Sequence, residues 1–177
     1  IIDSDSSQIE ARVLAWLAGQ EDLVTAFKEG RDVYKIMASA IYNKAEEDIS
    51  KPERFMGKTV VLGCGYGLGA EKFRAALKSQ GVELSEEEAV NIIRTYRETY
   101  PDIVRLWRSC QLMIQSMANG DSIQVEKRGV LTVLGEENAI RLPSGLTLPY
   151  KDLRATRNEE SKVEYQYRNR RGWTRIY

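Results

Sequence analysis

The strongest constraint on this chain is a spacing of four residues that repeats between Arg54 and Gly69. On an α-helix a step of four residues turns by about 400°, so each residue falls only about 40° from the one before it. One helical face would therefore carry two cations, then an apolar and an aromatic side chain. Cations can hold phosphates and an apolar, aromatic end can hold a planar ring, so this face suits a nucleotide. The residues are Arg54, Lys58, Leu62 and Tyr66.

Two other interpretations of this stretch stay open at this point. It could be an ordinary amphipathic helix whose cations are solvated. Alternatively, residues 59–62 could form a buried strand, and Gly65–Ala70 would then fit the G-x-G-x-x-A of an NAD-binding, Rossmann-type turn. That turn needs an acidic residue about 20 residues later. Glu86–Glu88 lie near that distance, but Ser85 before them predicts the capping box of a helix start instead.

Composition limits the chemistry that the chain can perform. The chain has 177 residues, a net charge of zero and 42% hydrophobic residues, which predicts a globular protein with a substantial core. It has no apolar run long enough for a membrane span and no signal peptide, so no membrane partner is expected. The absence of histidine excludes histidine-based triads and the usual catalytic zinc sites. The groups that remain available for catalysis are carboxylates, Lys, Arg and Tyr side chains, and Mg²⁺ bound by oxygen ligands. The isolated Cys64 and Cys110 favour free thiols in a reducing cytoplasm.

The first ten residues place acidic side chains on two adjoining predicted elements. Alternation after the first residue predicts a strand with Asp3 and Asp5 on one face, and a helix should begin at Ser7. Ser7 to Glu10 fits a capping box, in which Glu10 would close the helix start. In a second interpretation, Asp5 binds Mg²⁺ and Glu10 holds a polar ligand beside the helix N-terminus.

Longer motifs decide between these alternatives. Asp5–Arg12 reads DSSQIEAR and resembles motif A, D-x-S-Q-I-E-x-R, of the family A (polymerase I-like) DNA polymerases. Arg54–Gly67 resembles motif B of the same family, R-x3-K-x3-[FY]-x3-YG, and Phe27–Val33 resembles its F-x-x-G-x-D-[IV] segment. The motifs stand in the family's order. The resemblance is close over roughly the first 70 residues and looser afterwards.

The resemblance implies a role for each matching residue. Asp5 and the backbone carbonyl of Ser6 would bind the metal ions. Glu10 would pack beside the sugar and reject a 2′-hydroxyl. Arg54 and Lys58 would hold the incoming triphosphate. The expected dNTP-contacting set is Ser6, Gln8, Glu10, Tyr34, Arg54, Lys58, Leu62 and Tyr66.

The same resemblance places Tyr66 and Gly67 near the templating base, and two positions depart from the family pattern. Leu62 stands where most members have Phe or Tyr, which predicts altered sugar discrimination, speed or fidelity. Tyr34 stands where a His commonly touches the phosphates, and a phenol donates a hydrogen bond without bringing positive charge. Leu62 and the LPSG sequence at residues 142–145 fit a phage-type member.

The expected fold class is α+β, with a palm edge, a mostly helical fingers subdomain and a β-rich C-terminal segment. The expected boundaries are 1–25 for the start of the palm, 26–120 for the fingers and 121–177 for the segment that returns towards the palm. Helices are predicted at 32–43, 70–80, from 85 and at 101–120, and strands at 122–125, 130–134, 139–142, 146–150, 163–167 and 172–176. The basic tail, with Arg168, Arg170 and Arg171, is expected to contact DNA phosphates.

The expected activity is template-directed DNA synthesis by two-metal nucleotidyl transfer from dNTPs to a primer 3′-hydroxyl. Primer-template DNA, dNTPs and two Mg²⁺ ions are the expected partners and cofactors, in a bacterial or phage-infected cell; no feature indicates a processivity factor. The chain starts without Met and lacks the family's second acidic motif, thumb and exonuclease, so it resembles an inactive piece of a longer enzyme. The alternatives are an NAD-binding oxidoreductase fragment and a catalytically dead nucleic-acid-binding relative.

Overall fold

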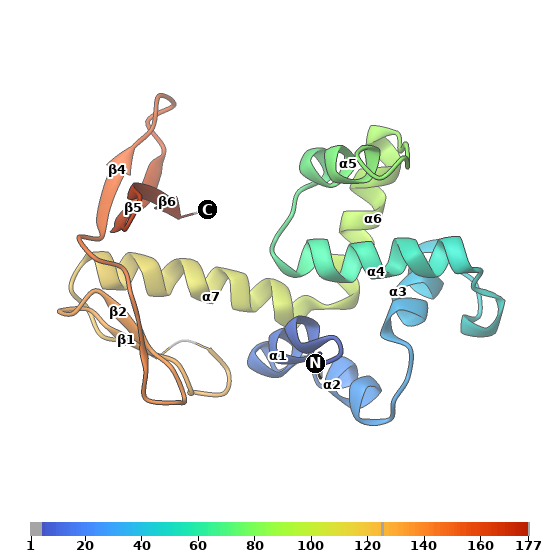
Figure 1. Ribbon diagram of the computed structural model, residues 1–177, viewed down its shortest axis with the longest axis horizontal. Coiled ribbons are helices and arrows are strands. Elements are labelled where there is room, and N and C mark those ends of the chain that lie inside the picture. Colours follow the sequence, from blue (N-terminus) through green and yellow to red (C-terminus); the bar gives the residue numbers. More distant parts are fainter. Residues whose placement is uncertain (1–4, 125, 177) are drawn as a thin grey trace, which may run out of the picture. The chain divides into compact units, whose positions relative to one another are not determined.

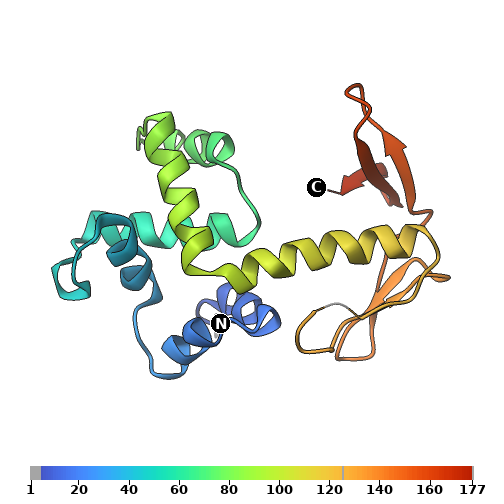
Figure 2. The ribbon, with the colours of Figure 1, turned by 180° about the vertical axis from the view of Figure 1, so that it is seen from behind.

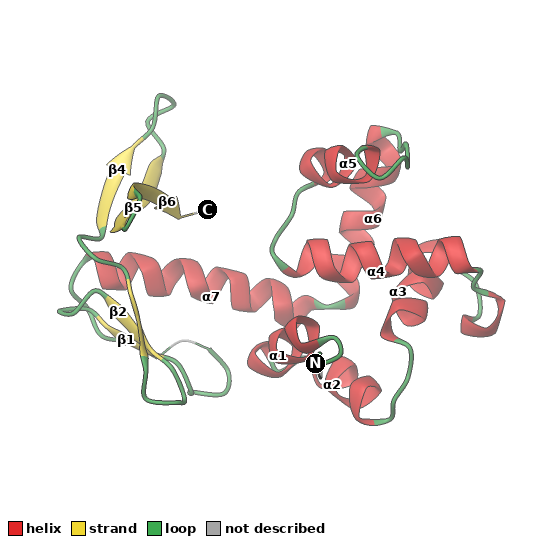
Figure 3. Cartoon of the chain, viewed as in Figure 1, coloured by secondary structure: helices red, strands yellow, loops and turns green. Residues whose placement is uncertain are grey.

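The computed structural model describes residues 5–124 and 126–176, which form two compact units divided between Arg105 and Leu106. The first unit is helical, and the second joins most of one long helix to short strands (Figures 1 and 3). The predicted α+β class is therefore confirmed. The first unit contains α1 (Ile9–Ala18), α2 (Glu21–Lys28), α3 (Val33–Tyr42), the 3₁₀ turn η1 (Glu46–Asp48), α4 (Lys51–Gly65), α5 (Ala70–Lys78), α6 (Glu86–Thr99) and the start of α7 (Pro101–Ala118).

Local side chains fix the start of α4, the helix that carries the repeated spacing. Ser50 and Glu53 form a reciprocal capping box, and Pro52 occupies the first turn, where a missing N–H costs nothing. Hydrogen bonds from Lys44 and then Ser50 lower the pKa of Glu53 to about 2. The helix runs without a break through residues 59–62, so the strand needed for an NAD-binding turn is absent there and that alternative is wrong.

Helices α3 and α4 lie side by side (Figure 2). Their backbones come close together at Gly57. A Cβ at this glycine would lie 2.1 Å from the carbonyl oxygen of Tyr34 and 3.1 Å from the amide nitrogen of Ala38. No other residue type allows this approach, because every other side chain begins with a Cβ. The space beside Gly57 is thus occupied by the backbone of α3.

The predicted capping box at Ser7 is wrong. Helix α1 begins at Ile9, and its N-cap residue, Gln8, has φ 58° and makes no side-chain capping bond. This left-handed turn leaves Ser7 outside the helix, where its carbonyl accepts a hydrogen bond from Arg12 Nε at 3.1 Å. The Glu10 carboxylate is therefore not used to close the helix. The first four residues of the predicted N-terminal strand lie outside the described residues.

Other helix ends agree with the sequence predictions. Ser85 and Glu88 form the second capping box at the start of α6. Gly81 adopts φ +79° just after α5, and the Val82 N–H reaches back to the Leu77 carbonyl at 3.0 Å, as in a Schellman ending. Helices α3 and α7 match the predicted helices at 32–43 and 101–120.

The core of the first unit lies between helices that are distant in sequence. Fully buried side chains include Met37 on α3, Val60 on α4, Phe73 and Leu77 on α5, and Tyr96 on α6. These contacts hold α4 against its neighbours along one side. They leave the side with the repeated spacing partly open to solvent.

The second unit packs two three-stranded antiparallel sheets around the later part of α7. Its core contains Met113, Met117, Val133, Ile140 and Leu153. The first sheet has the order β1 (Thr132–Leu134), β2 (Ala139–Arg141), β3 (Thr147–Pro149), and the second has the order β4 (Arg154–Arg157), β5 (Val163–Asn169), β6 (Gly172–Ile176).

Five of the six strands predicted after residue 120 are confirmed with small changes at their ends. The predicted strand at 122–125 is wrong for residues 122–124, and Val125 lies outside the described residues. Ile123 accepts one backbone bond, from Val133 N at 3.0 Å, so no ladder forms. Strand β4 was not predicted, because its sequence, RATR, lacks alternating apolar residues. Over the described residues, no helix is both long enough and apolar enough to cross a membrane.

Candidate functional site

Helices α1 and α4 line an open pocket of about 410 Å³ in the first unit. Three residues predicted to contact a nucleotide line it together: Glu10 from α1, Leu62 from α4 and Tyr66 at the end of α4. Most of the remaining lining is apolar, so the pocket offers a surface for a sugar or a base edge and one carboxylate. These other lining residues are Ile9, Ala11, Val13, Leu14, Leu17, Val61 and Gly65.

Glu10 and Tyr66 interact directly across this pocket. Hydrogen bonding with the nearby Glu10 carboxylate, followed by burial and the negative charge of Glu10, raises the pKa of Tyr66. The Tyr66 side chain is otherwise open to solvent, with 74% of its surface exposed. The left-handed turn at Gln8 frees Glu10 for this role, since the carboxylate does not cap its own helix.

Arg54 is held by residues of the α3 N-terminus. Its Nε donates to Asp32 Oδ2 at 2.6 Å, and its guanidinium lies 5.3 Å from the centre of the Tyr34 ring. Burial alone would raise the pKa of Asp32, but the hydrogen bond from Arg54 and those from the backbone of Lys35 and Tyr34 outweigh it and lower this pKa. Asp32 thus caps α3 and fixes Arg54 at the same time.

Lys58 lies one turn further along α4 and is exposed. Within the described part of the chain, its ammonium has no hydrogen-bond or ion-pair partner. The hydrogen bond to Asp32 fixes the direction of the Arg54 side chain, whereas the exposed Lys58 side chain can change its direction. On α4 this spacing forms a stripe that turns by about 40° per step, from the two cations to Leu62 and Tyr66, which line the pocket.

Asp5, Ser6 and Gln8 precede or begin α1. Asp5 and Ser6 are exposed, and the Ser6 carbonyl accepts a hydrogen bond from Ile9 N at 3.2 Å, which leaves its second lone pair available. Among the described residues, no three His, Cys, Asp or Glu side chains gather into a group that could hold a metal. Asp5 with one carbonyl covers only part of the octahedral oxygen shell that Mg²⁺ prefers.

Two residues near the site were missed by sequence reasoning. Asp32 was seen only as part of the Phe27–Val33 resemblance, although its place before a predicted helix is a signal for a cap. Arg12 lies with its guanidinium 4.7 Å from the centre of the Phe27 ring, which ties α1 to α2. Nothing in the local sequence pairs Arg12 with Phe27.

The remaining predicted contacts lie at a helix end and in the second unit. Gly67 has φ +75° directly after the end of α4, a conformation that favours glycine. Arg168 is on β5, and Arg170 and Arg171 form the turn between β5 and β6. All three arginines are exposed.

Comparison with known proteins gives consistent matches. The family model described as DNA polymerase family A matches residues 1–139. The chain is 39% identical over 103 residues to a thermostable DNA polymerase I of Thermus thermophilus, covering 58% of this chain and 12% of the relative. It is 31% identical over 135 residues to DNA polymerase I of Treponema pallidum, covering 75% of this chain and 13% of the relative.

A solved structure also resembles the chain. It is the POL domain of Pol1 from M. smegmatis in complex with a DNA primer-template and dNTP, with a TM-score of 0.52 and 26% sequence identity. The similarity covers 68% of this chain and 20% of that one. This chain thus corresponds to a small part of each protein that it matches.

Proposed function

The chain belongs to DNA polymerase family A, and from this premise we propose that it serves template-directed DNA synthesis as part of the palm and fingers. In this reaction a primer 3′-hydroxyl attacks the α-phosphorus of a dNTP, and pyrophosphate leaves. The observation that carries the proposal is the single face of α4 on which Arg54 and Lys58 continue into the pocket of Glu10, Leu62 and Tyr66.

Each part of this face would bind a different part of the nucleotide. Arg54 and Lys58 would bind the triphosphate, since cations form short, charge-assisted hydrogen bonds to phosphate oxygens. Leu62 and Tyr66 would contact the sugar and the base. Glu10, hydrogen-bonded to Tyr66, would occupy the space where a 2′-hydroxyl would lie. Gln8 and Tyr34 would support this arrangement from the start of α1 and from beneath Arg54.

The metal ions would lie near Asp5. Two Mg²⁺ ions, when bound, supply activation of the primer hydroxyl and neutralisation of the leaving phosphates. Asp5 and the Ser6 carbonyl would each contribute one oxygen ligand. Because this set is incomplete among the described residues, we propose that the 177-residue chain alone does not extend a primer.

The proposed subdomain boundaries follow the motifs. Residues 1–25 would begin the palm, 26–120 would form the fingers, and 121–177 would lead back towards the palm. Tyr66 and Gly67 would lie beside the template base, and Arg168, Arg170 and Arg171 would contact DNA phosphates. Primer-template DNA and dNTPs are the partners that this assignment requires.

The decisive experiment is a dNTP titration in the presence of Mg²⁺, followed by tryptophan fluorescence. Lys58→Ala should weaken binding about tenfold or more, since a charged hydrogen bond contributes about 1.5–3 kcal/mol. Lys51→Ala is the matched control, because it removes the same charge from an exposed lysine at the start of α4. Lys51→Ala should bind like the unchanged chain.

Two outcomes would contradict the proposal. Equal effects of Lys58→Ala and Lys51→Ala would show that only overall charge matters. Tighter binding of NAD than of dNTP, indifferent to Lys58, would point to a different class of nucleotide site.

A further inference from the structure

The second sheet of the second unit has two chemically different faces. Directly paired residues of neighbouring strands lie on the same face, so the register assigns each side chain. Val163, Tyr165, Tyr167 and Ile176 share the inner face, and the last three pack against the core of this unit. The outer face carries Arg154, Thr156, Glu164, Gln166, Arg168, Trp173 and Arg175.

The outer face combines an aromatic ring with a stacked guanidinium. Arg154 on β4 lies 3.6 Å from the centre of the Trp173 ring on β6, well within cation–π distance. Trp173 is nevertheless 48% exposed. The pair therefore presents a rigid planar group to solvent rather than to the core. Indole rings and guanidinium planes are the groups on which unpaired bases stack.

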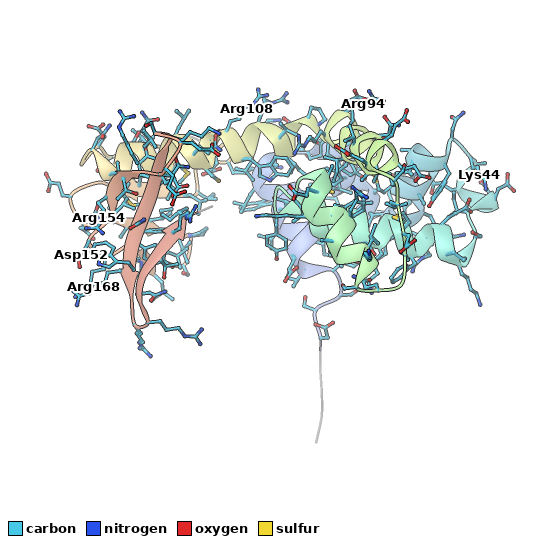
Figure 4. All side chains as sticks on the ribbon, turned by 90° about the horizontal axis from the view of Figure 1, so that it is seen from above. Lys44, Arg94, Arg108, Asp152, Arg154 and Arg168 are labelled. Carbon is cyan, nitrogen blue, oxygen red and sulfur yellow. The ribbon has the colours of Figure 1, made fainter. Side chains whose placement is uncertain are left out.

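Arginines surround this planar pair. Arg154 and Arg175 flank Gln166 in one row across the sheet, which places them about 10 Å apart at a strand spacing of roughly 4.8 Å. Arg168 pairs directly with Trp173. Figure 4 shows the side chains of Arg154 and Arg168 extending from the same side of the sheet, together with Asp152.

Two carboxylates offset part of this charge. Glu164, whose side chain is 18% exposed, accepts from Arg175 at 2.8 Å. Asp152 lies 3.9 Å from Arg168 at an exposed position, where ion pairs are weak. Three outer-face arginines still outnumber the one outer-face glutamate, and Arg170 and Arg171 extend the positive charge into the adjoining turn. The face thus complements a polyanion.

We propose that this outer face of β4–β6 binds single-stranded DNA, with one base stacked on the Arg154–Trp173 pair and phosphates held by Arg168 and Arg175. A single strand is favoured over a duplex, because the stacking surface reaches only bases that are not already paired. This goes beyond the phosphate contacts that the proposed function assigns to Arg168, Arg170 and Arg171, and the matched family region ends at residue 139, before this sheet. This inference rests on the proposed function only where it identifies the bound single strand as DNA.

The test is fluorescence anisotropy of the 177-residue chain with a labelled oligothymidylate of about 20 nucleotides, which exceeds the usual site size. EDTA is present and dNTP is omitted, so nucleotide binding at the α4 site does not contribute. Arg154→Gln and Trp173→Leu should each weaken binding about fivefold or more. Arg168→Gln should lower the slope of log affinity against log salt by about 0.7.

Arg157→Gln is the matched control. Arg157 is exposed on the same strand and carries the same charge, but it pairs with Val163 on the inner face. It should bind single-stranded DNA like the unchanged chain, and the dNTP titration with Lys58→Ala is a separate experiment. The proposed function and this inference can therefore fail separately.

Three results would overturn the inference. Arg157→Gln could weaken binding as much as Arg154→Gln, which would show that the loss of affinity comes from the change in net charge alone. A duplex of the same length could bind as tightly as the single strand. Polyglutamate could bind equally well, which would assign the face to an acidic protein partner. Arg154→Gln keeps the tryptophan, so the test holds even if Trp173→Leu disturbs the sheet.

Discussion

The Asp32 carboxylate accepts a hydrogen bond from Arg54 and two from the first turn of α3. Removing it therefore affects both the helix start and the cation that we assign to the triphosphate. The exposed fractions of the two side chains, 31% for Asp32 and 40% for Arg54, indicate that water weakens the ion pair itself. Its larger contribution is to fix the direction of the guanidinium.

A pH dependence follows from this residue. The pKa of Asp32 is lowered below 3.8 in the folded state, so ionised Asp32 stabilises the fold above that value. The stabilisation should disappear as the pH falls through the folded-state pKa. We expect Asp32→Asn to be less stable than the unchanged chain at pH 7 and the difference to shrink at about pH 3.

Urea unfolding at both pH values measures this effect. Asp48→Asn is a suitable control, because it removes the same charge from an exposed position. A difference between Asp32→Asn and the unchanged chain that stays constant with pH would contradict the assignment.

At the scale of elements, the contact of α3 with α4 depends on one glycine. Gly57→Ala would place a Cβ 2.1 Å from the Tyr34 carbonyl, and helix backbones cannot yield as a flexible side chain can. Overpacking of this kind costs about 1–3 kcal/mol, which exceeds the gain of about 1 kcal/mol from replacing glycine with alanine in a helix. We expect net destabilisation in urea unfolding.

Gly63→Ala on the same helix is the matched comparison. Its Cβ would meet only Leu68 Cδ2, at 3.5 Å, an ordinary contact. This change should be neutral or stabilise the fold by up to about 1 kcal/mol. If both alanine variants changed stability equally, the close α3–α4 approach would not be the cause.

A buried carboxylate organises the turn before β1. Glu126 is 6% exposed and accepts hydrogen bonds from three backbone amides, those of Arg128, Gly129 and Leu131. Glu126→Ala would leave these amides without their acceptor, at a cost of about 1–3 kcal/mol or more. Urea unfolding should show this loss, whereas the exposed Glu136→Ala should change stability by less than about 0.5 kcal/mol. Equal effects would argue against the role of Glu126.

At the scale of the whole molecule, the two units differ in how far the sequence predicts them. The helical unit contains the motifs, and its helix ends at Ser50, Gly81 and Ser85 follow local rules. The β-rich unit was predicted in outline, but β4 was missed and residues 122–124 were assigned wrongly. Strands depend on distant partners, so short segments carry weak signals.

The sequence by itself determined most of the helices, the capping box at Ser85, the stripe on α4 and the family, because these depend on residues three or four positions apart or on contiguous motifs. Only the tertiary structure decided that Glu10 hydrogen-bonds to Tyr66, that Asp32 holds Arg54 and that Gly57 meets α3. These contacts join residues on different elements. Their formation depends on how helices pack, which no local pattern of side chains specifies.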